Sequence, residues 1–323
     1  MKQKRELKGG PVKNQKLPNE TGADDKESFT IDNIFKLNQW GVRKAASRHL
    51  SEIFHCDSAD EPRLNQRIDF QKFANRTNSC SNSFVYVREV DENTGEIKPK
   101  LKYTTACHVR LCPLCQWRRN RIWTNRIIDA YPQIMALYPK FGFILLTLTD
   151  KACEVGELRQ TIKHFNSSWR RLFRRKELSA VKGWIKTIRV TRENDGLAHP
   201  HFHCLLMVGS GYFGRAYIKH GRWMELWRET ARLDYDPQVD IRAIKSKNRP
   251  GEASYSILPN GFADMLEYAV DIKNLVAEPD GETGEWVREL ANQLHRTRAI
   301  ESSGILREVF RKIGMNIEKN QEE

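Results

Sequence analysis

Apolar and polar positions along the chain follow the periods of strands and helices in turn. FGFILLTLTD (141–150) is an almost continuous apolar run of strand length, which is typical of a buried β-strand. GWIKTIRVTREN (183–194), HFHCLLMV (201–208) and VDIRAI (239–244) predict three further strands, and IESSGIL (300–306) predicts an edge strand. Apolar residues at helical spacing predict helices at 31–54, 116–138, 155–178, 213–233, 262–275 and 283–299, with a last amphipathic helix after the edge strand.

The order of these elements predicts an α+β fold. Strands alternate with helices, but several strands follow one another without a connection long enough for a parallel crossover, so we expect a sheet with helices packed on a face. SFVYVREV (83–90) and KLKYTTA (100–106) flank a turn-rich segment and predict a separate hairpin. Shifts in composition predict four parts: a disordered basic arm at 1–30, a helical and cysteine-rich region at 31–138, a domain with the main sheet at 139–312 and a tail at 313–323.

The charge balance favours a polyanionic partner. The 323 residues include 54 Lys and Arg against 41 Asp and Glu, a net charge of +13, which suits nucleic acid or an anionic membrane surface. The N-terminal segment lacks the apolar stretch of a signal peptide, and no run approaches the ~18 apolar residues of a membrane span. We therefore expect a cytoplasmic protein with no membrane span, and the charge alone fits either nucleic acid as a partner or a merely basic soluble protein.

Three of the seven cysteines form a compact motif. CHVRLCPLC places Cys107, Cys112 and Cys115 at C-x4-C-x2-C. Thiolates this close repel one another unless a soft cation such as Zn²⁺ neutralises them, so a structural zinc site is expected. The hairpin would bring Cys80 beside Cys107, which makes Cys80 the expected fourth ligand and His108 the second choice. The alternative is a set of buried cysteines without a metal.

The segment after these cysteines is rich in arginine. A zinc-held module would fix the orientation of Arg118, Arg119 and Arg121, so we expect these residues to bind DNA. RRLFRRK (170–176), at the end of another predicted helix, is a second basic segment that could follow DNA. Charged helix faces more often simply face solvent.

HPHFHCLLMVG carries three histidines at the start of an apolar strand. Residues i and i+2 share a face of a strand, so His201 and His203 project together, on the side away from Phe202. Pro200 is expected to start the strand, which leaves the direction of His199 open. Two imidazoles side by side on a rigid sheet can hold a divalent ion, Mg²⁺ or Mn²⁺, with positions open to a phosphate oxygen. The alternative is a pair of histidines satisfied by solvent or by the core.

A predicted helix near the C-terminus pairs a carboxylate with a phenol. ADMLEYAVDIKN (263–274) places Asp264 and Tyr268 four residues apart, on one helical face. A phenol can attack a phosphodiester, and a carboxylate beside it can move protons on the phenol or on water. By itself such a pair is commonplace and more often structural.

Taken in order, CHVRLCPLCQWRRNR, LLTLTD, HPHFHCLLM and the acid–tyrosine helix resemble the rolling-circle plasmid replication initiators of the HUH endonuclease superfamily. The resemblance is to the bacterial family with an N-terminal cysteine-rich segment, and it covers roughly residues 78–312. It implies an HUH-type central antiparallel sheet with flanking helices, preceded by a small zinc-stapled segment. It also implies that His201 and His203 hold Mg²⁺ or Mn²⁺ and that Tyr268 is the nucleophile.

The chain departs from the family pattern at several positions. Asp264 stands where the family usually has glutamate, and Asp271 where it tends to have lysine, so Lys273 becomes the candidate for contact with phosphate or phenol. The strand before the histidines often begins E-V-T in the family, whereas residues 189–191 read RVT, which leaves a third metal ligand open. The candidates for it are His199, Glu193 and Asp195, with His199 first by proximity.

The resemblance implies a metal-dependent, site-specific endonuclease that nicks and transfers a DNA strand at a plasmid origin. Tyr268 would attack a nick site presented single-stranded in a hairpin, giving a 5′-phosphotyrosine and a priming 3′-OH. Asp264 would activate water for the terminating cleavage. After a replication round the protein would rejoin the DNA strand or terminate replication, and a host helicase and polymerase would be its partners. The alternatives are an HUH transposase, whose tyrosine also follows the histidines, and a zinc-dependent DNA-binding regulator without nuclease activity.

Overall fold

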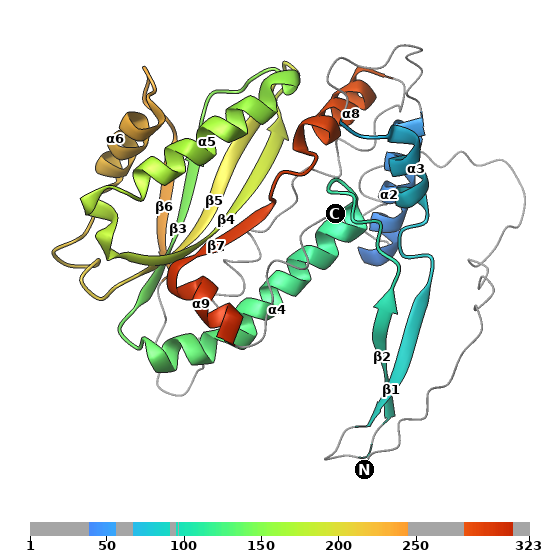
Figure 1. Ribbon diagram of the computed structural model, residues 1–323, viewed down its shortest axis with the longest axis horizontal. Coiled ribbons are helices and arrows are strands. Elements are labelled where there is room, and N and C mark those ends of the chain that lie inside the picture. The colour runs from blue at the N-terminus through green and yellow to red at the C-terminus, as the bar shows by residue number, and fades with distance from the viewer. Residues whose placement is uncertain (1–38, 56–66, 91–94, 96, 245–280, 313–323) are drawn as a thin grey trace, which may run out of the picture.

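The computed structural model describes residues 39–55, 67–90, 95, 97–244 and 281–312 (Figure 1). A five-stranded antiparallel sheet with the order β6-β3-β5-β4-β7 forms its centre, which confirms the α+β class. The central strand is the histidine strand, β5, with β3 on one side and β4 on the other. The strands are β3 Gly142–Thr149, β4 Val181–Arg192, β5 Ala198–Val208, β6 Val239–Ile244 and β7 Ile300–Ser303.

Helices cover both faces of this sheet (Figure 1). One face packs against α5 (Leu158–Leu172) and α6 (His220–Ala231), where the Phe202 ring lies 5.1 Å from that of Phe165. The other face packs against α4 (Pro113–Leu137) and α9 (Gly304–Lys312) through Leu205 and Met207 of β5. Because alternate residues of β5 point to opposite faces, its apolar half contributes to two cores.

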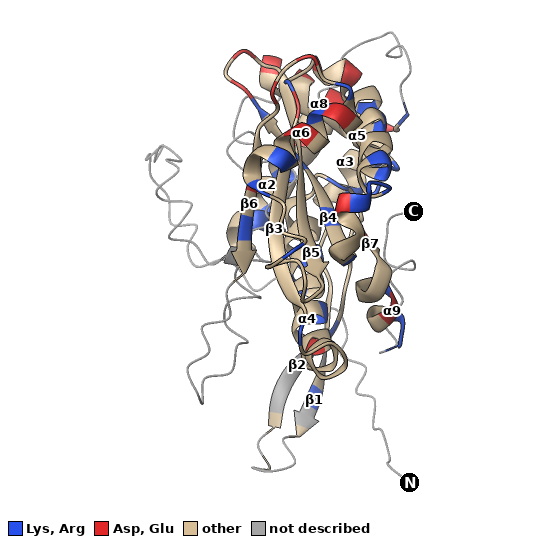
Figure 2. Ribbon diagram, turned by 90° about the vertical axis from the view of Figure 1, so that its left-hand side faces the viewer, with Lys and Arg blue, Asp and Glu red and all other residues tan. Residues whose placement is uncertain are grey.

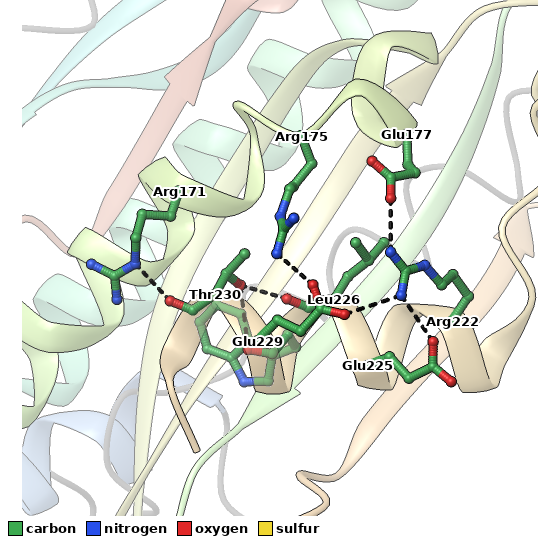
Figure 3. Close-up of polar contacts among 9 residues, drawn as sticks. Arg171, Arg175, Glu177, Arg222, Glu225, Leu226, Glu229 and Thr230 are labelled. Atoms are coloured by element: carbon green, nitrogen blue, oxygen red, sulfur yellow. Dashed lines mark hydrogen bonds and ion pairs between the residues drawn. The ribbon is translucent and has the colours of Figure 1, made fainter. Parts of the chain in front are cut away.

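An ion-pair network joins α6 to the segment after α5 (Figure 3). Arg222 of α6 donates to Glu177 at 2.8 Å and to Glu225 at 2.9 Å, and Arg175 pairs with Glu229. Arg171 donates from Nε to the carbonyl oxygen of Thr230 at 2.7 Å. Arg171 and Arg175 of the second basic segment are therefore engaged in contacts within the protein.

The N-terminal region combines two helices with the predicted hairpin. Its elements are α2 Gln39–His55, α3 Phe70–Asn78, β1 Phe84–Val90 and β2 Ile97–Thr104, and α8 Glu282–Leu294 packs against them. The sequence analysis did not predict α3. Asp69 caps this helix by accepting a hydrogen bond from the backbone N–H of Lys72 at 2.9 Å, and Phe70, Ala74 and Thr77 are its buried positions.

The predicted regions 31–138 and 139–312 share their packing. Trp123 and Ile127 of α4 lie in the same apolar cluster as Phe143 of β3. On the other side, the buried Arg288 of α8 donates to the carbonyl oxygen of Ile53 in α2 at 2.7 Å. Figure 1 shows α4 running from the hairpin to the sheet, so one long helix connects the two regions.

Three predicted helices differ in length from those observed. α5 ends at Leu172 and is followed by a short 3-10 helix, Lys176–Ala180, while α6 begins only at His220 and α8 ends at Leu294. The apolar pattern continues past the helix ends because the flanking turns also contribute to the core. Within the described ranges, no helix is long and apolar enough to cross a bilayer.

Candidate metal centres

Four cysteine sulfur atoms meet where the hairpin and α4 begin. The Sγ atoms of Cys80, Cys107, Cys112 and Cys115 all lie within 4.8 Å of one another. Cys80 precedes β1 and Cys107 follows β2, and the pairing of these strands, extended by a 2.7 Å hydrogen bond from Ser81 N to Thr105 O, brings the two together. His108, the second choice, is exposed and lies outside the cluster.

The spacing of the sulfur atoms suits a tetrahedral metal. Cys115 Sγ lies 3.6 Å from Cys80 Sγ and 3.5 Å from Cys107 Sγ, and Cys112 Sγ lies 3.7 Å from Cys80 Sγ. A tetrahedral ion with Zn–S bonds of about 2.3 Å sets its sulfurs about 3.8 Å apart, whereas a disulfide needs about 2.05 Å. The pKa of Cys80 is lowered because its thiolate accepts hydrogen bonds from the other three thiols. The donor set therefore fits a soft cation in a closed shell.

Polar groups from α2 and α3 hold this cluster in place. Lys44, only 6% exposed, donates to the carbonyl oxygen of Cys80 at 2.6 Å and to Asn82 Oδ1 at 2.7 Å. Ser47 Oγ lies 3.3 Å from Cys112 Sγ, and Arg76 donates to the carbonyl oxygen of Cys107 at 2.5 Å. The helical apolar pattern at 31–54 places Lys44 on the polar face of its helix, yet the side chain is buried. Its burial arises from contacts with residues 34 to 38 positions away, which periodicity does not reveal.

The second candidate centre lies on β5. The strand begins at Ala198, so the prediction that Pro200 starts it is wrong. Pro200 sits inside the strand opposite Val190, and His199 pairs with Thr191. The extra residues at the start of the strand put His199 on the same face as His201 and His203.

The two predicted ligands are half-buried and neutral. Burial, then the neighbouring imidazoles, lower the pKa of His201 to about 3, and burial lowers that of His203 to about 4. Both rings are therefore uncharged at neutral pH, and each has a nitrogen lone pair. His201 Nε2 lies 3.0 Å from Thr191 Oγ1, a neighbour that orients the ring. This arrangement can bind a cation without first displacing protons.

The candidates for a third ligand make polar contacts in and beside the β4–β5 turn. His199 Nδ1 lies 2.6 Å from Glu193 Oε1, and Asp195 accepts a hydrogen bond from Leu197 N at 3.1 Å. Gly196 closes this turn at φ +86°, a conformation that favours glycine. The ring centroid of His199 lies 4.4 Å from that of His201. His199 is thus the candidate adjacent to the pair, supported by the Glu193 carboxylate.

Arg189 is a site residue that sequence reasoning did not place beside the histidines. It lies directly opposite His201 in the β4–β5 register, with its side chain on the same face. Its positive charge lowers the pKa of both His201 and His203. Thr147 and Thr149 of β3 pair with His203 and His201 on the other side. The RVT motif includes Arg189, but the sequence does not show which residue of the neighbouring strand lies opposite it, because that depends on the strand register.

The remaining predicted residues divide into two groups. Arg118 donates to the carbonyl oxygen of Thr104 at 3.3 Å, and the guanidinium of Arg121 lies 5.3 Å from the Trp117 ring centroid, both beside the hairpin. Arg119 is half-buried on the same helix. Asp264, Tyr268 and Lys273 lie outside the described residues.

Comparison with known proteins identifies the family. A family of replication proteins matches residues 98–323. The chain is 28% identical over 290 residues to Protein rep of Streptococcus pneumoniae serotype 2 (strain D39 / NCTC 7466), covering 88% of this chain and 82% of the relative. It is 30% identical over 298 residues to Protein rep of Bacillus amyloliquefaciens, covering 87% and 83%, and 31% identical over 264 residues to Protein rep of a Bacillus species, covering 76% and 82%. No solved structure matches the chain.

The chain therefore belongs to this replication protein family. These matches confirm the resemblance to rolling-circle plasmid replication initiators. The protein is a plasmid replication protein, and its family implies nicking activity and DNA binding at an origin.

Proposed function

We propose that this protein starts plasmid replication by nicking one strand of the double-strand origin and joining it to Tyr268. The observation that carries the proposal is the pair of neutral imidazoles, His201 and His203, on one face of the central strand of the sheet. A rigid strand fixes their separation, and their lowered pKa values leave both free to bind a cation at neutral pH. Membership of a replication protein family supplies the substrate class, DNA.

His201 and His203 would hold the catalytic ion, Mg²⁺ or Mn²⁺, with His199 as the third protein ligand. When bound, such an ion draws charge from a phosphate oxygen and makes the phosphorus easier to attack. The protein itself orients the rings: Thr191 contacts His201, and Glu193 contacts His199. The threonines of β3 support the sheet, since Thr149 Oγ1 donates to the carbonyl oxygen of Gln238 at 2.9 Å.

Tyr268, Asp264 and Lys273 enter this proposal from the sequence alone. The Tyr268 phenol oxygen forms a bond to phosphorus while the bond to the 3′ oxygen of the preceding nucleotide breaks; the phenol gives up its proton, and the leaving 3′ oxygen takes up one. The products are a 5′-phosphotyrosine and a 3′-OH that primes synthesis. Asp264 activates water for the terminating cleavage, and Lys273 neutralises phosphate.

The cysteine cluster would hold Zn²⁺ as a structural ion. Four thiolates leave no coordination position for substrate, so this ion staples the start of the hairpin to the start of α4. Arg118, Arg119 and Arg121 follow on that helix and would contact phosphates of the origin. Residues 139–312 would then carry the chemistry and 31–138 the zinc region, between the basic arm at 1–30 and the tail at 313–323. A host helicase and polymerase would extend the 3′ end.

The proposal is tested with end-labelled single strands that tile the plasmid origin, incubated with the full-length protein and Mn²⁺ and separated on a denaturing gel. We expect one strand to be cut at a single position, and we expect His201→Ala and His203→Ala to lower the cutting rate by at least ~10²-fold. His164→Gln, an exposed histidine of α5, is the matched control and should cut like the wild type.

Origin binding without cutting across divalent ions would overturn the proposal and favour a DNA-binding regulator. Equal cutting by the wild type and both histidine variants would place the metal site elsewhere. Cutting at transposon ends, with none at a plasmid origin, would favour a transposase.

A further inference from the structure

A groove of about 830 Å³ lies between the hairpin and the first turns of α4, next to the cysteine cluster. Its walls include Trp40 of α2, Phe84 of β1, Tyr103 of β2, and Trp117, Arg118 and Arg121 of α4. Figure 1 shows the hairpin projecting away from the sheet beside this end of α4. The groove is therefore separate from the histidine face of β5.

The side chains that line the groove are basic and aromatic. Lys102, Arg118 and Arg121 are its cations, and none of the described residues that line it is Asp or Glu. Figure 2 shows acidic residues gathered near α6 and α8, toward the opposite end of the molecule from the hairpin. Phosphates would therefore meet positive charge in the groove without carboxylates to repel them.

Two aromatic side chains of the groove, Tyr103 and Phe84, are exposed to solvent. Tyr103 of β2 is 54% exposed, and Phe84 of β1 is 38% exposed. Trp117 is half-buried, with the guanidinium groups of Arg43 and Arg121 lying 5.4 Å and 5.3 Å from its ring centroid. Exposed rings between cations are the arrangement with which proteins stack unpaired bases while following the phosphates.

We infer that this groove binds single-stranded DNA, with bases stacked on Tyr103 and its aromatic neighbours and phosphates on Lys102, Arg118 and Arg121. A single strand is favoured over a duplex because the faces of paired bases are hidden inside the helix, where no ring can stack on them. A peptide would need acidic side chains to pair with the cations of the groove, and only its apolar side chains would pack on the aromatic rings. The inference rests on the proposed function for its substrate, and it adds a site for unpaired DNA away from the nick.

The cysteine cluster borders this groove. Cys80 and Cys115 both line it, one from the start of the hairpin and the other from α4. A metal held by these thiolates would fix the distance between the hairpin side and the α4 side of the groove.

The test measures fluorescence anisotropy of labelled oligothymidylate of about 16 nucleotides, the upper range of such sites, on the full-length protein. We expect Tyr103→Ser to weaken binding about tenfold while Tyr103→Phe, which keeps the ring, binds like the wild type. We expect Arg118→Gln with Arg121→Gln to weaken binding and to lower the slope of log affinity against log salt by about 1.4, or 0.7 per phosphate. Lys140→Gln with Lys163→Gln, two exposed lysines away from the groove, removes the same charge and should change neither the affinity nor the slope.

The inference would be overturned if Tyr103→Ser bound oligothymidylate as tightly as the wild type. It would also be overturned if the double variant in the groove and the control double variant lost equal affinity. A duplex of the same length should bind Tyr103→Ser and the wild type equally. Failure of the nicking proposal is separable, because Tyr268→Phe should still bind oligothymidylate in the groove. Thermal unfolding and zinc content of each variant show whether a loss of affinity reflects a loss of fold.

Discussion

Arg189 of β4 lies directly opposite His201 of β5, on the face of the sheet that also carries His203. A cation beside two candidate metal ligands opposes the binding of a second cation, and it lowers the pKa of both imidazoles. The proposed metal site of this protein therefore depends on its histidines and carries a repulsive neighbour.

Arg189→Glu should strengthen divalent-ion binding. The change removes the repulsive charge and places a carboxylate across the strand pair from His201, so we expect Mn²⁺ affinity to rise about tenfold or more. Arg189→Gln, which only removes the charge, should give a smaller rise. Calorimetric titration with Mn²⁺ measures both, and unchanged affinity in the two variants would show that the ion binds elsewhere.

Cys112→Ser should release the structural ion. The wild type should contain about one zinc per chain, because four thiolates form one closed tetrahedral shell. We expect the variant to lose this zinc and to unfold at a lower temperature, since metal binding contributes directly to folding. Cys204→Ala is the matched control: Cys204 is equally buried but lies in the sheet, outside the cluster. Elemental analysis that finds equal zinc in both variants would contradict the assignment.

Gly304→Ala should destabilise the junction of β7 and α9. Gly304 has φ +61°, and an added Cβ would lie 2.2 Å from the carbonyl oxygen of Lys182 and 2.9 Å from the Cα of Gly183. Because both contacts are backbone atoms, we expect a loss of at least ~2 kcal/mol in the free energy of unfolding. Gly221→Ala, in α6 with no atom near its added Cβ, should instead gain up to ~1 kcal/mol. Urea titration compares the two, and a similar small effect for both would contradict this account.

Lys186 is a buried cation that pairs with Glu301. It is 2% exposed and lies 3.2 Å from Glu301 Oε2 and 2.5 Å from Asn166 Oδ1. Glu301→Gln leaves this ammonium without its anion, so we expect a loss of about 2 kcal/mol in unfolding free energy. Lys186→Met combined with Glu301→Gln should recover much of this loss, because an apolar side chain suits the surrounding Phe202. A double variant less stable than Glu301→Gln would contradict the expectation.

The same lysine gives a pH dependence with a defined sign. Burial lowers the pKa of Lys186 from 10.5 despite the nearby Glu301. The folded chain therefore binds this proton less tightly than the unfolded chain, and stability falls as pH falls from 10.5 through the lowered pKa. Lys186→Met should flatten this part of the curve of unfolding free energy against pH.

Local patterns predicted the main sheet well. The apolar run at 141–150 and the alternation at 201–208 became β3 and β5, and the register of the hairpin explains how Cys80 reaches Cys107. These features depend on neighbouring residues, on strand periodicity and on a short turn. The short connection between β4 and β5, residues 193–197, is too short for a parallel crossover and supports the α+β class.

Features set by distant contacts were not predictable in the same way. Lys44 looks like a solvent-facing lysine on its helix, yet it is buried against the loop that carries Cys80. Pro200 looks like a strand start, but its missing N–H is tolerated inside β5. α3 was not among the predicted helices, although Asp69 and the spacing of its buried residues fit a short capped helix.

The most direct test of the central claim locates the covalent bond between protein and DNA. The protein is incubated with the cut origin strand and Mn²⁺, digested, and the nucleotide-bearing peptide is sequenced by mass spectrometry. The proposed mechanism predicts a nucleotide phosphate on Tyr268, absent from Tyr268→Phe and from His201→Ala, and retained in the control Tyr255→Phe. An adduct on another residue, or cutting without any adduct, would contradict it.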